Sequence, residues 1–330
     1  MSIDCVYASA SWGLHDLRWT NALRELGHEP AVVVLGRDVE IGNFRNAVVE
    51  ASAAELPVLA GPLTTVTRHL NIDHDLPKVV GLSWGFDLHE LETTRDLTWL
   101  AELSGLIVDS DPTMKIALQC GVPESHLTFL PWGVDLELFT PTGPLFDLSS
   151  LNLQPGTRLL LSLRAHEPLY RVEEIVKAFA QAHDDHPNLV LLIGHTGSLT
   201  RDLRSLVTEL GLEESVRFIG AIDESQVAEL MRVCVGYISA AEVDGTSVTL
   251  LQAMACGTAV IASDSPGNLC WISPNTGFLF HIGSVTQQAA AISQALTMDV
   301  SRRTEAALDL VRSRADWHAN LGRLETALFG

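Results

Sequence analysis

The polar residues with the clearest chemical potential fall in one stretch of the chain, residues 237–260. There an apolar run of strand type gives way to a short polar loop, and a helical pattern begins near Thr246. Free backbone N–H groups at a helix start, helped by the helix dipole, bind phosphate well. Asp244 comes just before that start, and Gln252 lies roughly 7–8 Å further along the helix axis. This spacing suits a nucleotide sugar, with its hexose on one side of the diphosphate and its ribose on the other.

The same stretch also fits an ordinary turn between a strand and a helix. In that interpretation Asp244 caps the helix and Gln252 faces solvent. A Gly-Thr-Ser sequence is common before helices, which favours this interpretation. The residues alone leave both interpretations open.

The elements that must position these residues are visible as short apolar runs that alternate with helical patterns. Apolar runs without polar alternation are typical of strands covered on both faces. We expect such strands at 3–8, 31–35, 78–83, 105–109, 158–163, 189–193, 216–219, 234–238 and 258–262. We expect helices at 15–27, 172–183 and 315–329. The repetition of strand, helix and strand predicts an α/β fold with parallel sheets.

The pattern pauses between residues 139 and 157, where FTPTGPLFDLSSLNLQPGT holds three prolines and two glycines. This composition is typical of a linker between domains. We expect one Rossmann-like domain over 1–138, a linker over 139–156, a second Rossmann-like domain over 157–310 and a C-terminal helix over 311–330. Doubly wound sheets bind ligands at the carboxyl ends of their strands, so one ligand could lie between two facing halves.

The amino-acid composition disfavours some classes of binding partner. The net charge is −20, from 41 acidic and 21 basic residues, which disfavours nucleic acid and strong association with anionic membranes.

Five cysteines without CxxC spacing indicate reduced thiols and a cytoplasmic protein. The first residues lack a basic segment followed by an apolar run, so we expect no signal peptide. The spacing of the histidines does not match a metal-ligand pattern, so we expect no metal site.

The 237–260 stretch resembles the donor-site motif of the retaining family 4 glycosyltransferases of GT-B fold. Their usual pattern is Glu, seven residues, Glu, then Ala-Met-Ala-Cys-Gly and a Pro-Val or similar pair. Here Asp244, seven residues and Gln252 are followed by AMACGTAV, and Ser-Asp at 263–264 and NTGFL at 275–279 also resemble the family. The match is long and in order, which makes it more specific than a lone Gly-rich loop.

Other segments agree with this resemblance. Ser-Leu-Arg at 162–164 resembles the strand end with the family's phosphate-binding arginine, which a lysine and a glycine usually follow. Here Arg171 is the candidate to replace that lysine; the alternative is that Arg171 is a solvated residue at a helix start. Residues 192–195 and 216–220 resemble the strand ends that flank the nucleotide base. The segment 131–139 resembles the one before the linker, and the last helix resembles the one that crosses back to the first domain.

The resemblance implies a GT-B fold, two Rossmann-like domains whose parallel sheets face each other across a cleft, and a set of site residues. The catalytic candidates are Arg164, Arg171, Asp244 and Asp87. The donor-binding candidates are Gly13, Gly194, Ile219, Gly220, Glu242, Gly245, Thr246, Ser247, Val248 and Gln252. The acceptor-binding candidates, from the first domain, are His15, Asp16 and Trp84. For Asp87 a helix N-cap, and for His15 a structural role, are the alternatives.

The implied reaction is glycosyl transfer from a nucleotide sugar to an acceptor hydroxyl with retention, without any cofactor beyond the donor. The two arginines and the amides of 246–248 would stabilise charge on the departing diphosphate, while Asp244 orients the sugar and Gln252 binds the ribose. The acceptor would be a small molecule or a saccharide. Asp244 is shorter than the usual Glu and Gln252 is uncharged, so a non-catalytic or altered-donor relative is one alternative and a phosphorylase of the same fold another. A nicotinamide-dependent dehydrogenase is disfavoured, because no GxGxxG follows the first strand.

Overall fold

The computed structural model describes residues 2–52, 55–70, 76, 78–92, 97–151, 153 and 156–330. The chain divides into two compact units, one formed by Met1–Pro131 with His318–Gly330 and the other by Trp132–Trp317. Residues 132–138 and 311–317, which we expected to belong with the first domain, group with the second unit. Within the expected linker, residues 152, 154 and 155 lie outside the described residues.

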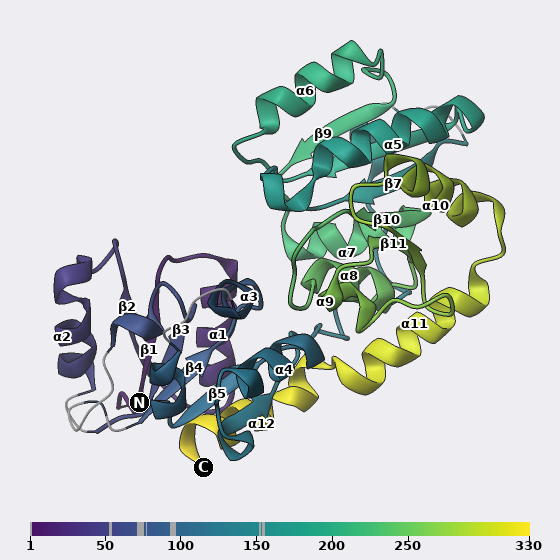
Figure 1. The fold of residues 1–330 in the computed structure, drawn as a ribbon. Helices are drawn as coiled ribbons and strands as arrows, with labels where there is room; N and C mark the ends of the chain where they lie inside the picture. Colours follow the sequence, from purple (N-terminus) through teal and green to yellow (C-terminus); the bar gives the residue numbers. More distant parts are fainter. Residues whose placement is uncertain are drawn as a thin grey trace. The chain divides into compact units, whose positions relative to one another are not determined.

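The first unit is built on a six-stranded parallel sheet in the order β2-β1-β3-β4-β5-β6 (Figure 1). Its strands are β1 (Cys5–Ser9), β2 (Pro30–Val34), β3 (Val58–Gly61), β4 (Val79–Leu82), β5 (Gly105–Val108) and β6 (Leu127–Phe129). Its helices are α1 (Leu14–Glu25), α2 (Ile41–Ala51), α3 (Phe86–Glu92), α4 (Asp111–Gln119) and, from the end of the chain, α12 (Trp317–Phe329). Short 3-10 turns cover Thr67–His69, Thr98–Glu102 and Glu124–His126.

Helices α2, α3 and α4 pack their apolar side chains on the first sheet and form one core with it. The last helix, α12, joins this unit through buried leucines and through the ring of Phe329, which stacks on His28 with centroids 3.8 Å apart. His318 Nδ1 also lies 2.6 Å from Glu25 Oε1, at the end of α1. The first unit is therefore completed by a segment far away in the sequence.

The second unit holds another six-stranded parallel sheet, in the order β12-β11-β10-β7-β8-β9. Its strands are β7 (Arg158–Ser162), β8 (Leu189–Gly194), β9 (Val216–Gly220), β10 (Gly236–Ser239), β11 (Ala259–Ser263) and β12 (Phe278–Phe280). Its helices are α5 (Val172–Asp185), α6 (Thr200–Glu209), α7 (Glu224–Val233), α8 (Val248–Ala255), α9 (Pro266–Leu269), α10 (Val285–Thr297) and α11 (Ser301–Arg314). Two 3-10 turns cover Leu148–Leu151 and Pro168–Tyr170.

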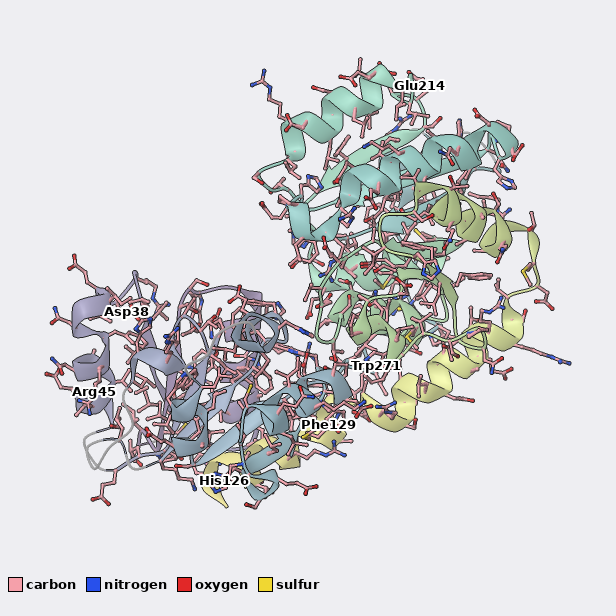
Figure 2. The ribbon with its side chains drawn as sticks, in the orientation of Figure 1. Asp38, Arg45, His126, Phe129, Glu214 and Trp271 are labelled. Carbon is pink, nitrogen blue, oxygen red and sulfur yellow. The ribbon has the colours of Figure 1, made fainter. Side chains whose placement is uncertain are left out.

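Two apolar cores sandwich the second sheet. Helices α7, α8 and α11 pack on one face and α5, α6 and α10 on the other, as Figure 1 shows. The strands read as continuous buried runs because side chains on both faces are covered. Glu214 and Asp38, both labelled in Figure 2, are examples of exposed charge, with side chains that are 99% and 37% exposed.

All nine strands expected from the sequence are present, with ends shifted by one or two residues. The strands β3, β6 and β12 were not expected; β6 and β12 have only three residues each, too few to carry a pattern. The expected helices are confirmed as α1, α5 and α12. Sequence reasoning therefore recovered the alternation and lost the shortest elements.

The two crossings of the chain between the units run side by side inside the second unit. The Val134 N–H donates to the Ala315 carbonyl (2.7 Å), and the Trp317 N–H donates to the Val134 carbonyl (3.0 Å). A Cβ added to Gly133 would lie 2.7 Å from the Trp317 Cα. The backbones thus approach so closely that no side chain fits at position 133.

Gly133→Ala should therefore lower the free energy of unfolding by about 1–3 kcal/mol, as overpacking does when rigid backbone must move. The control is Gly322→Ala on α12, where an added Cβ meets nothing within 4 Å. That change should stabilise the helix by about 0.5–1 kcal/mol. Thermal and urea unfolding of both variants measure the difference. Equal midpoints would contradict the close approach.

Candidate functional site

The order of strands in the second sheet marks where a ligand should bind. From β7 the chain moves outward through β8 and β9, and it then returns to place β10, β11 and β12 on the other side. The strand order therefore reverses between β7 and β10, and doubly wound sheets bind ligands at the carboxyl ends of such strands. Arg164 follows β7, and the loop 240–247 follows β10. Both belong to the predicted site.

The Arg164 side chain lies buried at this point, with 11% of its surface exposed. Its Nη2 is 2.8 Å from Asp244 Oδ2, its Nη1 donates to Ser247 Oγ (2.8 Å), and its guanidinium carbon lies 4.1 Å from the centre of the Tyr170 ring. Burial lowers the pKa of Arg164, but Asp244, Tyr237 and Tyr170 together more than offset this, so the net shift is upward. The site therefore holds a permanent positive charge.

Helix α8 begins at Val248 with Ser247 as its N-cap residue, and no side chain caps it. The Ser247 hydroxyl is turned toward Arg164 instead. Thr246 and Ser247 are 5% and 3% exposed, so the start of the helix lies within the protein beside a fixed cation. This arrangement offers an anion both the positive end of the helix dipole and a guanidinium.

The ordinary-turn interpretation of this stretch is wrong on both residues. Gln252 is 5% exposed and lies in the buried run of α8, so it does not face solvent. Asp244 pairs with Arg164 and does not cap α8. Both side chains are built into the interior of the predicted site.

Helix α9 and the end of β11 pack against the loop between β10 and α8. A Cβ on Gly267 would lie 2.2 Å from the carbonyl oxygens of both Asp244 and Gly245, so only glycine fits there. The Ser263 hydroxyl donates to the Ala241 carbonyl (2.6 Å), and Asn268 Nδ2 donates to the Ser263 carbonyl (3.0 Å). Sequence reasoning noted Ser263 only as part of the resemblance and missed Gly267 and Asn268.

Arg171 takes part in a different arrangement from the one expected. It precedes α5 with φ 49° and ψ 39°, a left-handed conformation that glycine adopts most readily. The ring of Tyr170, one residue earlier, packs on Arg164. The side chain of Arg171 pairs with Glu174 and donates to Glu242 Oε2 (3.1 Å).

Glu174 anchors Arg171 from within the unit. It is 8% exposed and also accepts from Gln288 Nε2 on α10 (3.1 Å). The hydrogen bond from Arg171 to Glu174 is the largest cause of the raised pKa of Arg171. Glu174 and Gln288 lie on separate helices, and nothing in the sequence signalled that they meet.

The ends of β8 and β9 bring the expected base-flanking residues together. The His195 N–H donates to the Gly220 carbonyl (2.7 Å), with both residues at positive φ. Gly194 has no room for a side chain, because a Cβ there would lie 2.4 Å from the Leu163 side chain. Burial lowers the pKa of His195, and Arg164 lowers it further, so its imidazole is neutral near pH 7. His195 was quoted in the resemblance but not expected as a site residue.

Two acidic candidates of the first unit act as structural acceptors. Asp16 is 1% exposed and accepts hydrogen bonds from the Gly13 N–H (2.8 Å), the Tyr7 hydroxyl (3.0 Å) and the Ser9 hydroxyl. Its oxygens close the loop after β1 and do not reach solvent. Asp16 as a direct acceptor contact is therefore corrected to a residue that shapes the loop.

Asp87 is fully buried between the loops that follow β3 and β4. Its carboxylate accepts hydrogen bonds from the Leu63, Trp84 and Leu88 N–H groups and from the Ser83 hydroxyl. Burial raises the pKa of the Asp87 carboxyl, and these hydrogen bonds lower it, with burial the larger effect. A direct catalytic role is corrected to a positioning role, because every approach to its oxygens is occupied by the protein.

The remaining candidates of the first unit lie at the ends of β1 and β4. The rings of His15 and Trp84 meet edge to face with centroids 5.3 Å apart. Trp12, beside Gly13, is 41% exposed, and the Arg37 guanidinium lies 4.8 Å from its ring centre. The structure thus places the His15 and Trp84 rings in contact near the carboxyl ends of β1 and β4.

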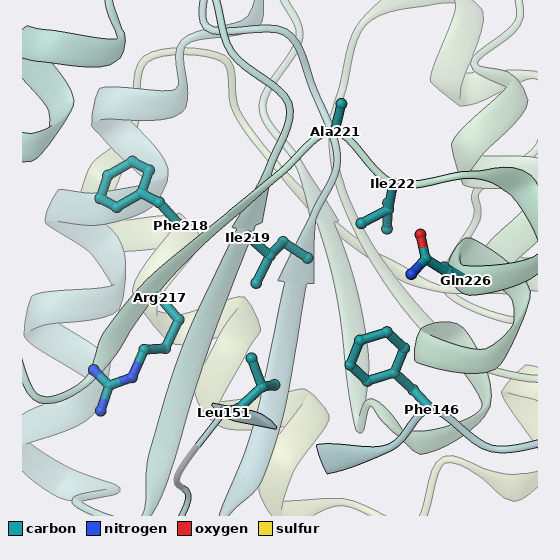
Figure 3. Close-up of a pocket in the computed structure, with 8 residues that line it drawn as sticks. All are labelled: Phe146, Leu151, Arg217, Phe218, Ile219, Ala221, Ile222 and Gln226. Carbon is teal, nitrogen blue, oxygen red and sulfur yellow. The ribbon is translucent and has the colours of Figure 1, made fainter. Parts of the chain in front are cut away.

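A cavity of about 460 Å³ opens elsewhere in the second unit, along the edge strand β9 (Figure 3). It is lined by Phe146, Leu151, Arg217, Phe218, Ile219, Ala221, Ile222 and Gln226. Ile219, an expected donor contact, thus faces this groove with its side chain. The cavity lies away from the switch point between β7 and β10, and we favour the switch point as the site because charge and helix dipole meet there.

In the part of the chain that the structure describes, no group of three or more His, Cys, Asp and Glu side chains could hold a metal ion. The same part contains no helix long and apolar enough to cross a membrane.

Comparison with known families decides what kind of site this is. Residues 146–308 match the family described as glycosyl transferases group 1. The chain carries a group 1 glycosyltransferase domain. This domain covers the whole sheet of the second unit, with Arg164, the 240–247 loop and α8.

Relatives of the whole chain extend the similarity into the first unit. The chain is 29% identical over 298 residues to the D-inositol 3-phosphate glycosyltransferase of Stackebrandtia nassauensis, covering 80% of this chain and 66% of that protein. It is 27% identical over 206 residues to the GDP-mannose-dependent monoacylated alpha-(1-6)-phosphatidylinositol monomannoside mannosyltransferase of Corynebacterium glutamicum, covering 58% and 53%. The chain thus spans between half and two thirds of the length of these relatives.

The fold matches that of a solved glycosyltransferase-like structure over its full length. The Anabaena protein HepE, in complex with UDP and glucose, superposes with a TM-score of 0.79 at 18% identity, covering 99% of each chain. At this identity the likeness concerns the fold, which is GT-B: two Rossmann-like domains, each with a parallel sheet. The predicted fold class is confirmed.

Asp87→Asn should lower the free energy of unfolding of the protein by about 1–3 kcal/mol, because the amide NH₂ would face N–H donors and leave them unsatisfied. The control is Asp38→Asn, which removes a carboxylate from an exposed ion pair with Arg37 and should cost about 0–1 kcal/mol. Urea unfolding of both variants checks this. A directly catalytic Asp87 would instead give a variant of native stability that has lost only its activity.

Proposed function

We propose that the chain transfers a glycosyl group from a nucleotide-sugar donor to an acceptor hydroxyl with retention of anomeric configuration. The observation that carries this proposal is the buried Arg164 beside the uncapped start of α8, at the switch point of the second sheet. The group 1 family match supports it. The similarity to a GDP-mannose-dependent mannosyltransferase supports it as well.

The proposed chemistry needs a fixed positive field and no side-chain nucleophile. As the bond between sugar and diphosphate breaks, negative charge grows on the phosphate. Arg164 and the first amides of α8 stabilise that charge without reorganising, because they are already held in place. The acceptor hydroxyl attacks from the face that the diphosphate leaves, and its proton passes to the departing phosphate. The donor is a substrate, and the scheme uses no further cofactor.

The other candidates receive roles from their places around Arg164. We propose that Asp244 orients the sugar hydroxyls, that Gln252 binds the ribose and that residues 194–195 and 219–220 flank the base. Glu242 and Arg171 fix the loop between them. Gly13, His15 and Trp84 would contact the acceptor, a saccharide or small molecule. No disulfide joins cysteines within the described residues, which supports a cytoplasmic location.

Arg164→Ala is the decisive test of this function. Incubation with nucleotide sugars, with release of nucleoside diphosphate and the anomer of the product followed by NMR, should show retaining transfer by the unmodified protein. Arg164→Ala should weaken donor binding by about 1.5–3 kcal/mol, the value of a charge-assisted hydrogen bond. The matched control is Arg217→Ala, an arginine that lines the β9 cavity.

The two arginine variants separate the two candidate locations. Loss of binding in Arg164→Ala alone supports the switch point. Loss in Arg217→Ala alone would move the donor to the cavity of Figure 3. Unchanged transfer in Arg164→Ala, with native unfolding, would contradict the proposed role of this arginine.

Gln252 tests whether the ribose side of the site is functional. A carboxylate accepts from ribose hydroxyls more strongly than an amide does, since charge-assisted hydrogen bonds are roughly twice as strong as neutral ones. Gln252→Glu should therefore tighten donor binding by about fivefold, and Gln252→Ala should weaken it. Calorimetric titration of one confirmed donor compares the three forms. Three equal affinities would show that position 252 does not contact the nucleotide and would favour a non-catalytic relative.

A further inference from the structure

The positive charge that should bind a diphosphate is already neutralised by the protein itself. Arg164 Nη2 lies 2.8 Å from Asp244 Oδ2, and Nη1 donates to Ser247 Oγ at the same distance. The face of the guanidinium is covered by Tyr170. The groups that would meet an incoming phosphate are therefore engaged with a carboxylate and a hydroxyl from the loop after β10.

The carboxylate that occupies Arg164 is loosely bonded to it. Asp244 Oδ2 is buried and makes no well-directed hydrogen bond, although it lies at ion-pair distance from Nη2. The Asp244 side chain is 18% exposed, against 11% for Arg164. An ion pair of this kind combines strong attraction with poor hydrogen-bond geometry, so a competing phosphate with better geometry can replace the carboxylate.

The backbone around Asp244 is firm, so only its side chain is free to change partners. Gly267 packs under the Asp244 and Gly245 carbonyls, and Arg171 holds Glu242 two residues earlier. A diphosphate that takes Arg164 therefore leaves the Asp244 carboxylate in place without its cation. Such a carboxylate needs new hydrogen-bond donors, because a partly buried charge without partners is costly.

We propose that Asp244 is an internal anion that makes the site discriminate between an intact nucleotide sugar and the nucleoside diphosphate left after transfer. Each ligand must displace Asp244 from Arg164. The sugar hydroxyls of the intact donor then bond to the freed carboxylate, whereas the nucleoside diphosphate offers it nothing. The product consequently binds less well than its own phosphates would allow, and it leaves. This inference rests on the proposed function.

Removal of the internal anion gives the test. Binding of inorganic pyrophosphate, UDP, GDP, UDP-glucose and GDP-mannose is measured by calorimetry for the unmodified protein and for Asp244→Asn. Pyrophosphate needs no base, so it reports on Arg164 whichever nucleotide the protein uses. We expect pyrophosphate and the preferred nucleoside diphosphate to bind about tenfold more tightly to Asp244→Asn, and the advantage of the nucleotide sugar over its diphosphate to shrink by about as much.

Two controls separate this effect from a general change in charge or stability. Asp264→Asn removes one negative charge from the end of the neighbouring strand β11, where Asp264 pairs with His281 and not with an arginine. It should leave pyrophosphate affinity nearly unchanged. Thermal unfolding verifies that each variant is folded, and Asp244→Ser provides the same measurement if Asp244→Asn is unstable. In an Arg164→Ala background, Asp244→Asn should have no effect on pyrophosphate.

The outcomes distinguish the inference from the function beneath it. Unchanged or weaker pyrophosphate and diphosphate binding in the folded Asp244 variants, with retaining transfer intact in the unmodified protein, overturns the internal anion and leaves the function standing. An equal gain in Asp264→Asn also overturns it. If none of these ligands binds to any folded form and no transfer occurs, the proposed donor site itself is wrong.

Discussion

The arrangement of the second unit depends on keeping one guanidinium, that of Arg164, charged and oriented inside the protein. Such a charge is costly to bury, and it survives only with close partners. Tyr170 covers its face, while Ser247 and Asp244 approach its edge. The parallel sheet makes this possible, because β7 and β10 are neighbours and their ends deliver the cation and its partners to one point.

The surrounding contacts can be understood as supports for that point. Gly267 and Asn268 fix the loop after β10 from one side, and Arg171 with Glu174 fixes it from the other. These supports consist of close backbone packing and of ion pairs between separate elements. They fix the loop backbone around Asp244 on both sides. The frame around Arg164 is thus built from close packing and paired charges.

Much of the fold could be predicted from the sequence, because buried parallel strands appear in it as apolar runs between helical patterns. Arg164 and Asp244 were predicted for one site from their places at a strand end and before a helix start, and the structure brings them within ion-pair distance. Long-range partners were not predicted: Glu174 meets Gln288 across two helices, and Gly267 lies under a carbonyl, facts of packing that no local pattern records. The site roles of Asp16 and Asp87 were misjudged for the same reason, because only the structure shows how many N–H and O–H groups already occupy them.

Two segments that are far apart in the sequence form the first unit. This affects the order in which the chain can fold during synthesis. The second unit, Trp132–Trp317, is one continuous stretch, and it can close as soon as that stretch has left the ribosome. The segment Met1–Pro131 is synthesised earlier, but His318–Gly330, which completes the first unit, follows only after the whole second unit. Until then the apolar residues that Leu324 and Leu328 cover lack these partners. The first unit thus waits for the second unit to be synthesised, and in that interval its uncovered apolar surface is open to aggregation and to chaperones.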